Sequence, residues 1–297
     1  MPPSNAPAPE EPLGLRVSAV IVSYNQAAAL RGTIAALEAS RDRERLEIVV
    51  VDCASRDESA RMDTEFPSIN LLRLPHHIGA ARALNIATRT AKADLLLYLS
   101  PGVEVEPDTV AALADRLEPE SELAAVAPLL VDENGATASR LYKLPDRDAL
   151  AAAIRGSGLP PLAVDPTQES IPVEYPSLDA LMVRKVFVRG MNYFDERFGH
   201  YWVDANLAMQ VRRAAKKIVL YPPVRAKLHA TPDPLNGESL ARADRVTGAA
   251  AFLAKYEGGM AGFSFRLSQS FRALARFNLG QVTAILSARK LDGSQAS

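Results

Sequence analysis

Cysteine is nearly absent from this sequence of 297 residues, and the single copy, Cys53, excludes an internal disulfide. One cysteine also argues against a cysteine-rich metal site and is typical of a reducing compartment. The chain has no apolar run of the roughly eighteen residues needed to cross a bilayer, so no membrane-spanning helix is predicted. Basic residues are not in excess, because the net charge is −1. The sequence therefore lacks the usual mark of a nucleic-acid-binding protein.

The N-terminus has no recognisable secretion signal. Residues 1–13 are rich in proline and alanine, and they lack the basic start and the apolar core of such a signal. We expect a disordered tail over residues 1–14 and a cytoplasmic protein. With 48% hydrophobic residues, the chain can bury a sizeable core. We expect one large domain over residues 15–235 and a helical extension over residues 236–297.

Two strand-like runs near the N-terminus each end at a polar side chain. Residues 17–24 lead to Asn25, residues 46–51 lead to Asp52, and residues 27–40 between them have apolar side chains at helical spacing. Such a crossover joins parallel strands and is nearly always right-handed. Because ligands of open parallel sheets bind beyond the carboxyl ends of the strands, a nucleotide is the first ligand to consider. Asp52 is placed to accept a hydrogen bond from a base or ribose.

The glycine-rich turn of dinucleotide-binding enzymes is missing after the first run. Ser23, Tyr24, Asn25 and Gln26 stand in its place, which argues against a dehydrogenase.

The alternation of strands and helices continues along the chain. Helices are expected over 56–66, 79–90, 107–117 and 204–216, and strands over 69–74, 95–99, 123–131 and 177–183. Residues 143–176 contain many prolines and are predicted to form a long loop over the site. The pattern predicts a doubly wound α/β sheet with helices on both faces.

Several short motifs follow one another between residues 17 and 229. They are residues 17–25, residues 47–52 with Ser55 and Asp57, residues 77–79 with Asn85, residues 94–101, residues 194–198, residues 201–204, and His229. In this order and spacing they resemble a family 2 glycosyltransferase with the GT-A fold, closest to the rhamnosyltransferase-like branch. The resemblance implies a mixed sheet of the nucleotide-diphospho-sugar transferase type with a C-terminal helical extension.

The resemblance also implies a function. It suggests an inverting hexosyltransferase that uses a UDP- or dTDP-linked sugar and a glycan or lipid-linked acceptor, as in cell-envelope polysaccharide synthesis. Asp204 matches the family's general base, although its place near the start of a predicted helix also suits an ordinary capping aspartate. Trp202 is expected to line the acceptor pocket or to be buried by packing. The residues expected around the nucleotide and its diphosphate are Ser23, Tyr24, Asn25, Asp52, Asp57, Gly79, Arg82, Ser100 and Gly102.

The sequence departs from the family at the metal-binding motif. The related branch has Asn-Pro-Asp where this chain has Ser100, Pro101 and Gly102, so the carboxylate that would meet a Mg²⁺ or Mn²⁺ ion is missing. His229 matches the family's metal-binding histidine. Two interpretations remain open. In one, Arg82 and His229 stabilise the departing diphosphate without a tightly held metal. In the other, the chain is a catalytically reduced homologue that binds nucleotide or acts as a scaffold.

The C-terminal stretch is basic and contains an amphipathic pattern. Arg266, Arg272, Arg276, Arg289 and Lys290 against Asp292 give a local net charge of +4. Leu267, Phe271 and Leu274 follow one another at helical spacing. This helix is expected either to lie on the inner surface of an anionic membrane or to pack its apolar face on the catalytic domain.

Overall fold

The computed structural model describes residues 14–232, 234–235 and 239–291. Nearly all of the predicted N-terminal tail lies outside these residues. The strands are β1 (Val17–Ser23), β2 (Leu46–Asp52), β3 (Asn70–Arg73), β4 (Leu95–Leu99), β5 (Val103–Val105), β6 (Leu123–Val131), β7 (Leu141–Tyr142), β8 (Ile171–Val173), β9 (Tyr175–Pro176), β10 (Ala180–Arg184) and β11 (Lys217–Leu228). The helices are α1 (Ala27–Glu38), α2 (Met62–Glu65), α3 (Ala80–Thr90), α4 (Thr109–Leu117), α5 (Arg147–Ala152), α6 (Lys185–Gly190), α7 (Val203–Arg213), α8 (Ser239–Tyr256), α9 (Gly259–Ala275) and α10 (Leu279–Leu286), with short turns η1 (Arg43–Arg45), η2 (Glu58–Arg61) and η3 (Ala153–Ser157).

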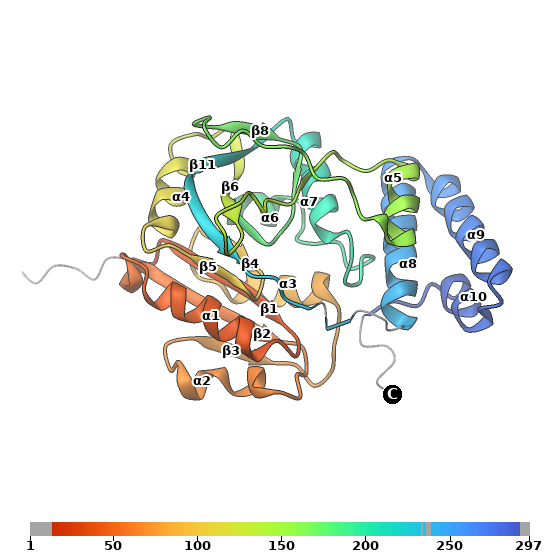
Figure 1. The fold of residues 1–297 in the computed structure, drawn as a ribbon, viewed down its shortest axis with the longest axis horizontal. Helices are drawn as coiled ribbons and strands as arrows, with labels where there is room; N and C mark the ends of the chain where they lie inside the picture. Colours follow the sequence, from red (N-terminus) through yellow and green to blue (C-terminus); the bar gives the residue numbers. More distant parts are fainter. Residues whose placement is uncertain (1–13, 233, 236–238, 292–297) are drawn as a thin grey trace, which may run out of the picture.

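A nine-stranded mixed sheet forms the centre of the molecule (Figure 1). Its order is β3-β2-β1-β4-β10-β6-β11-β5, with β8 paired to β11. Strands β3, β2, β1 and β4 are parallel, and β10 is antiparallel to β4. The register of β1 and β2 sets Ser23 opposite Asp52, so these two strand ends meet as predicted. The predicted mixed α/β sheet with helices is confirmed.

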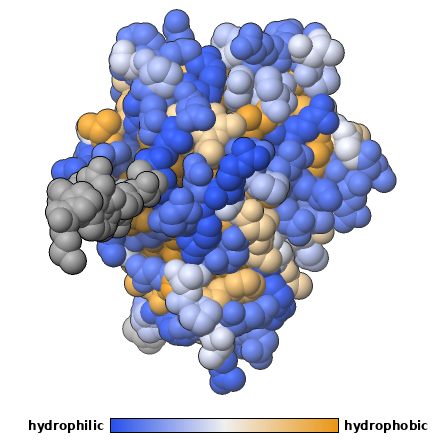
Figure 2. Space-filling view, turned by 90° about the vertical axis from the view of Figure 1, so that its left-hand side faces the viewer, coloured by the Kyte–Doolittle hydropathy of each residue, from blue (hydrophilic) through white to orange (hydrophobic). Residues whose placement is uncertain are grey.

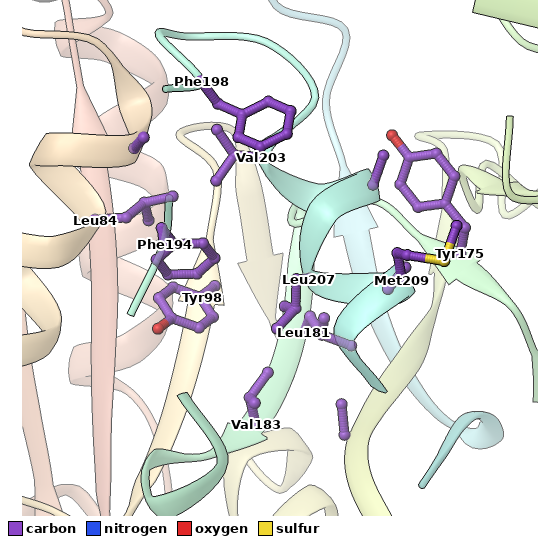
Figure 3. Packing of buried hydrophobic residues seen from close by; sticks show 14 of the residues in the cluster. Leu84, Tyr98, Tyr175, Leu181, Val183, Phe194, Phe198, Val203, Leu207 and Met209 are labelled. Carbon is purple, nitrogen blue, oxygen red and sulfur yellow. The ribbon is translucent and has the colours of Figure 1, made fainter. Parts of the chain in front are cut away.

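Alternating side chains bury both faces of the sheet. Ile21 packs in the cluster on the α1 and α4 side, whereas Val20 packs in the cluster on the α3 and α7 side. In the second cluster the Tyr98 ring meets the edge of Phe194 at 5.6 Å between ring centroids (Figure 3). This packing fixes α3 and the chain before α7 against β4, next to the strand ends that carry polar groups.

Two predicted segments have a different structure. The expected helix over 56–66 consists of the short elements η2 and α2. The expected loop over 143–176 contains α5, η3, β8 and part of the β7–β9 pair. Helix α5 begins at this point because Asp146 caps it by accepting a hydrogen bond from the Ala149 amide at 2.9 Å.

The strand β11 follows α7 and has no counterpart among the predicted elements. Its prolines, Pro222 and Pro223, lie at a shift in the register with β6, between Tyr221 and Arg225. Proline is tolerated in a strand at such an irregularity, because no ladder hydrogen bond is lost there.

Helices α8, α9 and α10 stack beside the sheet domain, with α5 against them (Figure 1). The Arg147 guanidinium of α5 donates to Ser264 Oγ of α9 at 2.8 Å. Within the described ranges, no helix combines the length and the apolar character that a bilayer crossing requires.

Candidate active site

A cavity of about 590 Å³ opens beside the carboxyl ends of β1 and β4. Its floor comes from β1, β4 and α3, and its walls come from the segment around β7 and β9, the start of α7, and α8. The polar and aromatic residues that line it are Tyr98, Ser100, Arg140, Tyr142, Tyr175, Ser177, Asp179, His200, Tyr201, Trp202, Asp204 and Arg245. The cavity thus lies where the sheet topology places a ligand.

Asp204 lies in the first turn of α7 and faces this cavity. The N-cap of the helix is Trp202 in a left-handed conformation (φ 68°), so Asp204 is not the capping residue. Its Oδ1 accepts a hydrogen bond from the Ala205 amide at 2.8 Å, and its carboxylate is hydrogen-bonded to Tyr175. Burial raises the pKa of Asp204 to about 6, against the lowering effect of these hydrogen bonds. A carboxyl group with this pKa accepts protons efficiently near neutral pH.

A second buried carboxylate, Asp179, lies beside the cavity just before β10. Its Oδ1 accepts a hydrogen bond from Ser100 Oγ at 3.0 Å, and its Oδ2 accepts one from Ser177 Oγ at 2.6 Å. Arg140 pairs with it at 3.3 Å. Sequence reasoning missed Asp179, although a carboxylate within a predicted apolar strand was a usable signal. The bonds fix the side chain of Ser100, which the sequence assigned to the diphosphate.

Two arginines line the cavity, and neither was predicted. Arg140 precedes β7, and Arg245 of α8 places its guanidinium carbon 4.5 Å from the centre of the Tyr201 ring. The backbone oxygen of Arg245 accepts a hydrogen bond from Trp202 Nε1 at 2.9 Å. This bond fixes the indole at the cavity wall, where Trp202 was expected. The C-terminal extension therefore contributes to the site.

Arg82 and His229, the cations expected at the diphosphate, do not line this cavity. Arg82 Nε donates to Glu196 at 3.2 Å. His229 Nε2 lies 3.1 Å from Glu104, and its Nδ1 lies 3.3 Å from Glu133. The hydrogen bond with Glu104 raises the pKa of His229. Both side chains are thus held by carboxylates of the protein itself.

The ends of β1 and β2 carry two unsatisfied polar atoms. Ser23 Oγ and Asp52 Oδ1 are buried and have no hydrogen-bond partner within the part of the chain that the structure describes. Asp52 Oδ2 accepts a hydrogen bond from the Ser55 amide at 3.1 Å. Next to them the rings of Tyr24 and His77 pack edge to face, with their centroids 4.9 Å apart. Buried polar groups are normally paired, so these two atoms suit a ligand that can bond to them.

Asn25 and Asp57 hold the loops around this edge. Asn25 adopts φ 50° and accepts a hydrogen bond from the Arg56 amide at 2.8 Å. Asp57 accepts hydrogen bonds from the amides of Ala27 at 2.9 Å and Ser59 at 3.0 Å. Their side-chain oxygens are therefore engaged in joining the β1 and β2 loops.

Gly79 lies under the C-terminal segment. It has φ 81°, and a Cβ atom there would overlap the carbonyl oxygen of Leu291. Leu291 also packs in a small apolar cluster with Tyr24. Its amide donates to buried Asp244 at 2.7 Å. Leu291 thus covers the carboxyl ends of β1 and β2, where Asp52 lies.

Gly102 turns away from the cavity. It has φ 94°, its amide donates to Thr33 Oγ1 at 2.9 Å, and a Cβ atom would lie 2.7 Å from Thr231 Cγ2. Its carbonyl accepts a hydrogen bond from the His229 amide at 2.9 Å. Among the residues that the structure describes, no three His, Cys, Asp or Glu side chains gather in a way that could hold a metal ion.

His200, another cavity residue that the sequence did not indicate, stacks near His77 at 5.6 Å between ring centroids. Burial lowers the pKa of His200 to about 3 and that of His77 to about 4. Both rings are neutral at physiological pH, so neither supplies positive charge to the site.

Comparison with known proteins relates this chain to glycosyltransferases. Residues 18–162 match the family model described as Glycosyl transferase family 2. An N-acetylglucosaminyltransferase from Mesorhizobium japonicum is 29% identical over 142 residues, which are 46% of this chain and 32% of that protein. The matched part thus spans about a third of the length of this relative.

Three solved structures share the fold. GalNAc-T7, solved with UDP, GalNAc and Mn²⁺, has a TM-score of 0.61 at 15% identity over 78% of this chain and 47% of its own. The mannosyltransferase PcManGT from Pyrobaculum calidifontis, solved with GDP-Man and Mn²⁺, has a TM-score of 0.54 at 17% identity over 96% of this chain and 77% of its own. TarS from S. aureus, residues 1–349, has a TM-score of 0.55 at 15% identity over 93% and 81%. The predicted GT-A fold is confirmed, while the rhamnosyltransferase-like branch stays a prediction.

Proposed function

We propose that this chain, whose residues 18–162 match the family model described as Glycosyl transferase family 2, moves a sugar from a nucleoside-diphosphate donor to an acceptor hydroxyl with inversion. The observation that carries the proposal is Asp204, a carboxylate with a raised pKa at the wall of the cavity beyond β1 and β4. The acceptor is a glycan or a lipid-linked glycan. The proposed setting is the cytoplasm, in cell-envelope polysaccharide synthesis.

The nucleotide is assigned to the edge formed by the ends of β1 and β2. Asp52 Oδ1 and Ser23 Oγ are buried polar atoms that lack a partner within the described residues, and a pyrimidine base of UDP or dTDP offers an N–H donor for the carboxylate. Solved relatives of the fold support a nucleotide-sugar donor, since they contain UDP or GDP-Man. Tyr24 adds an aromatic face at the same edge.

Asp204 is proposed as the general base. The carboxylate takes the proton of the acceptor hydroxyl, the acceptor oxygen forms a bond to the anomeric carbon, and the bond from that carbon to the diphosphate oxygen breaks. The nucleoside diphosphate leaves with the electron pair of the broken bond. The Tyr175 hydrogen bond fixes the carboxylate on the helix, so that it does not need to reorient during the reaction.

The charge on the departing diphosphate needs a positive partner. Mg²⁺ or Mn²⁺ supplies this neutralisation where it is bound, but the residues of this site do not fit such an ion. Gly102 has no side-chain ligand, and His229 is held by Glu104 and Glu133 away from the cavity. Arg245 and Arg140 are the cations at the cavity wall. We assign the role to Arg245 because its guanidinium lies over the ring of Tyr201, another residue of the cavity wall, at 4.5 Å.

The loss of the carboxylate at position 102 also favours a second candidate, a homologue that binds nucleotide without transferring sugar. Calorimetric titration of the protein with UDP and dTDP, in Mn²⁺ and in EDTA, tests donor binding. Release of nucleoside diphosphate from the matching sugar nucleotides then tests chemistry. We expect binding in both buffers together with slow release in the absence of acceptor. Binding without any release, with acceptor glycans supplied, would favour the second candidate, and absence of binding would overturn both.

A further inference from the structure

Helix α9 turns its apolar side toward solvent, whereas a surface helix normally packs that side against the protein. It is buried through Gly262, Phe265, Gln269, Ser270 and Ala273, a face that is mostly small or polar. Its other large apolar side chains point to solvent, which is the reverse of the usual amphipathic arrangement. Of the two alternatives that the sequence left open for Leu267, Phe271 and Leu274, packing on the catalytic domain is therefore wrong.

The exposed apolar residues form one continuous stripe. The stripe consists of Met260, Phe263, Leu267, Phe271 and Leu274. Their relative exposure runs from 38% to 77%, and at 100° per residue they lie within an arc of roughly 80° on the helix. Phe277 in the turn after α9 and Leu279, the first residue of α10, are also exposed apolar residues. An apolar patch of this kind marks an interaction surface.

The charged side chains of α9, of α10 and of the chain that follows to Leu291 have a single sign. Residues 258–291 contain five cations, Arg266, Arg272, Arg276, Arg289 and Lys290, and no aspartate or glutamate. The face shown in Figure 2, at the opposite end of the molecule from α9, is mainly hydrophilic, with apolar residues in small groups. Charge and exposed apolar area thus coincide on α9 and the chain that follows it.

We propose that the stripe of α9 lies in the interface of an anionic lipid membrane. The helix has 17 residues, and its apolar side faces one direction, so it suits a position in the plane of the interface and cannot span the bilayer. Arg266 lies about 60° around the helix from the nearer edge of the stripe, where it can meet the negative lipid headgroups. Arg272 and Arg276 lie farther around the helix and at its end, and they add to the positive charge of this part of the molecule. A second copy of the chain fits less well, because a symmetric dimer through this stripe would bring the cations of both copies together without an acid between them.

Co-sedimentation of the full chain with vesicles tests the proposal. We expect pelleting with phosphatidylcholine vesicles that contain phosphatidylglycerol, weak pelleting with phosphatidylcholine alone, and loss of binding as salt is raised. The double variant Phe271→Asp and Leu274→Asp removes the centre of the stripe, and we expect at least a tenfold loss of bound fraction at limiting lipid. The matched control is Val186→Asp, another exposed apolar residue, at 72% exposure on α6, and it is expected to bind as the parent does.

The charge contribution is tested separately. Arg272→Gln with Arg276→Gln is expected to weaken binding about twentyfold, since each surface arginine contributes about fivefold. The control pair, Arg189→Gln with Arg212→Gln, removes two exposed cations elsewhere and leaves binding unchanged. Circular dichroism melts show that each variant folds.

Three results would overturn the proposal. They are a parent that does not pellet with anionic vesicles, equal losses for the stripe variant and its control, and a dimer in sedimentation velocity that Phe271→Asp with Leu274→Asp converts to a monomer while vesicle binding is absent. All of these readouts are independent of sugar transfer, so they do not depend on the proposed function.

Discussion

The two ends of the candidate site are built differently. At the Asp52 end, the polar groups come from neighbouring strands and their loops, and Leu291 covers that edge. At the Asp204 end, the groups come from segments far apart in the chain and surround an open cavity. The first end has the buried polar atoms that we assign to a nucleotide, and the second has space and a carboxylate with a raised pKa. Binding and chemistry should therefore respond to different mutations.

The largest effect is expected from Asp204→Asn. Asparagine keeps the hydrogen-bond acceptor but cannot take a proton, so turnover should fall by roughly a thousandfold while UDP affinity is unchanged. In the parent, turnover should fall about tenfold per pH unit below the pKa of about 6, because the protonated carboxyl is not a base. Steady-state rates from pH 4.5 to 8 check both statements, and a variant with parental turnover would remove Asp204 from the mechanism.

The same substitution should make the protein more stable at neutral pH. The pKa of Asp204 in the folded protein, about 6, is above the ordinary carboxyl value of 3.8. The folded state thus binds the proton more readily than the unfolded chain, and the contribution of this group to stability falls as pH rises through this window. Asparagine has no charge to bury, so the melting temperature of the Asp204→Asn variant at pH 7.5 should exceed that of the parent. A lower melting temperature would indicate that the carboxylate is satisfied in the fold.

The next largest effect is expected from Arg245→Gln, with Arg82→Gln as its control. Loss of the cation at the cavity should lower kcat by about a hundredfold, with partial recovery in Arg245→Lys, because the developing charge on the diphosphate loses its partner. Arg82 is an arginine paired with Glu196 at the surface, and its loss should change kcat less than about twofold and stability by less than about 1 kcal/mol. A larger loss of single-turnover rate for Arg82→Gln than for Arg245→Gln would indicate that Arg82 contacts the diphosphate instead.

The sequence predicted the strands and the helix of the Asp52 end well because they are local. Strand β1, helix α1 and strand β2 follow hydrophobic periodicity closely, and parallel pairing alone brings Ser23 beside Asp52. The position of Asp204 at the start of α7 was also predicted, from its place in a family motif and from the apolar pattern of the helix. No comparable pattern predicted β11, because its two prolines interrupt the strand pattern where the register with β6 shifts.

The remaining residues of the site depend on contacts that no local pattern encodes. Ser100 bonds to Asp179, 79 positions away, and Trp202 bonds to the backbone of Arg245, 43 positions away. These pairs exist because β10 inserts beside β4 and α8 packs against the start of α7. The orientation of α9 is a similar case, because periodicity identifies an apolar stripe but not what covers it.

The smallest of the expected effects on the site comes from Asp52→Ala, and it concerns affinity. Removal of a charge-assisted hydrogen bond of about 1.5 to 3 kcal/mol should weaken UDP binding by about ten- to a hundredfold in calorimetry, with kcat at saturating donor little changed. Asp57→Ala is the matched control, because its oxygens are occupied by the Ala27 and Ser59 amides. That variant should lose about 1 kcal/mol of stability and retain its affinity for UDP. If both variants lose affinity equally, UDP binding depends on the conformation of the loops after β1 and β2. If only Asp52→Ala does, the carboxylate itself contacts the nucleotide, and the division between a binding end and a chemical end holds.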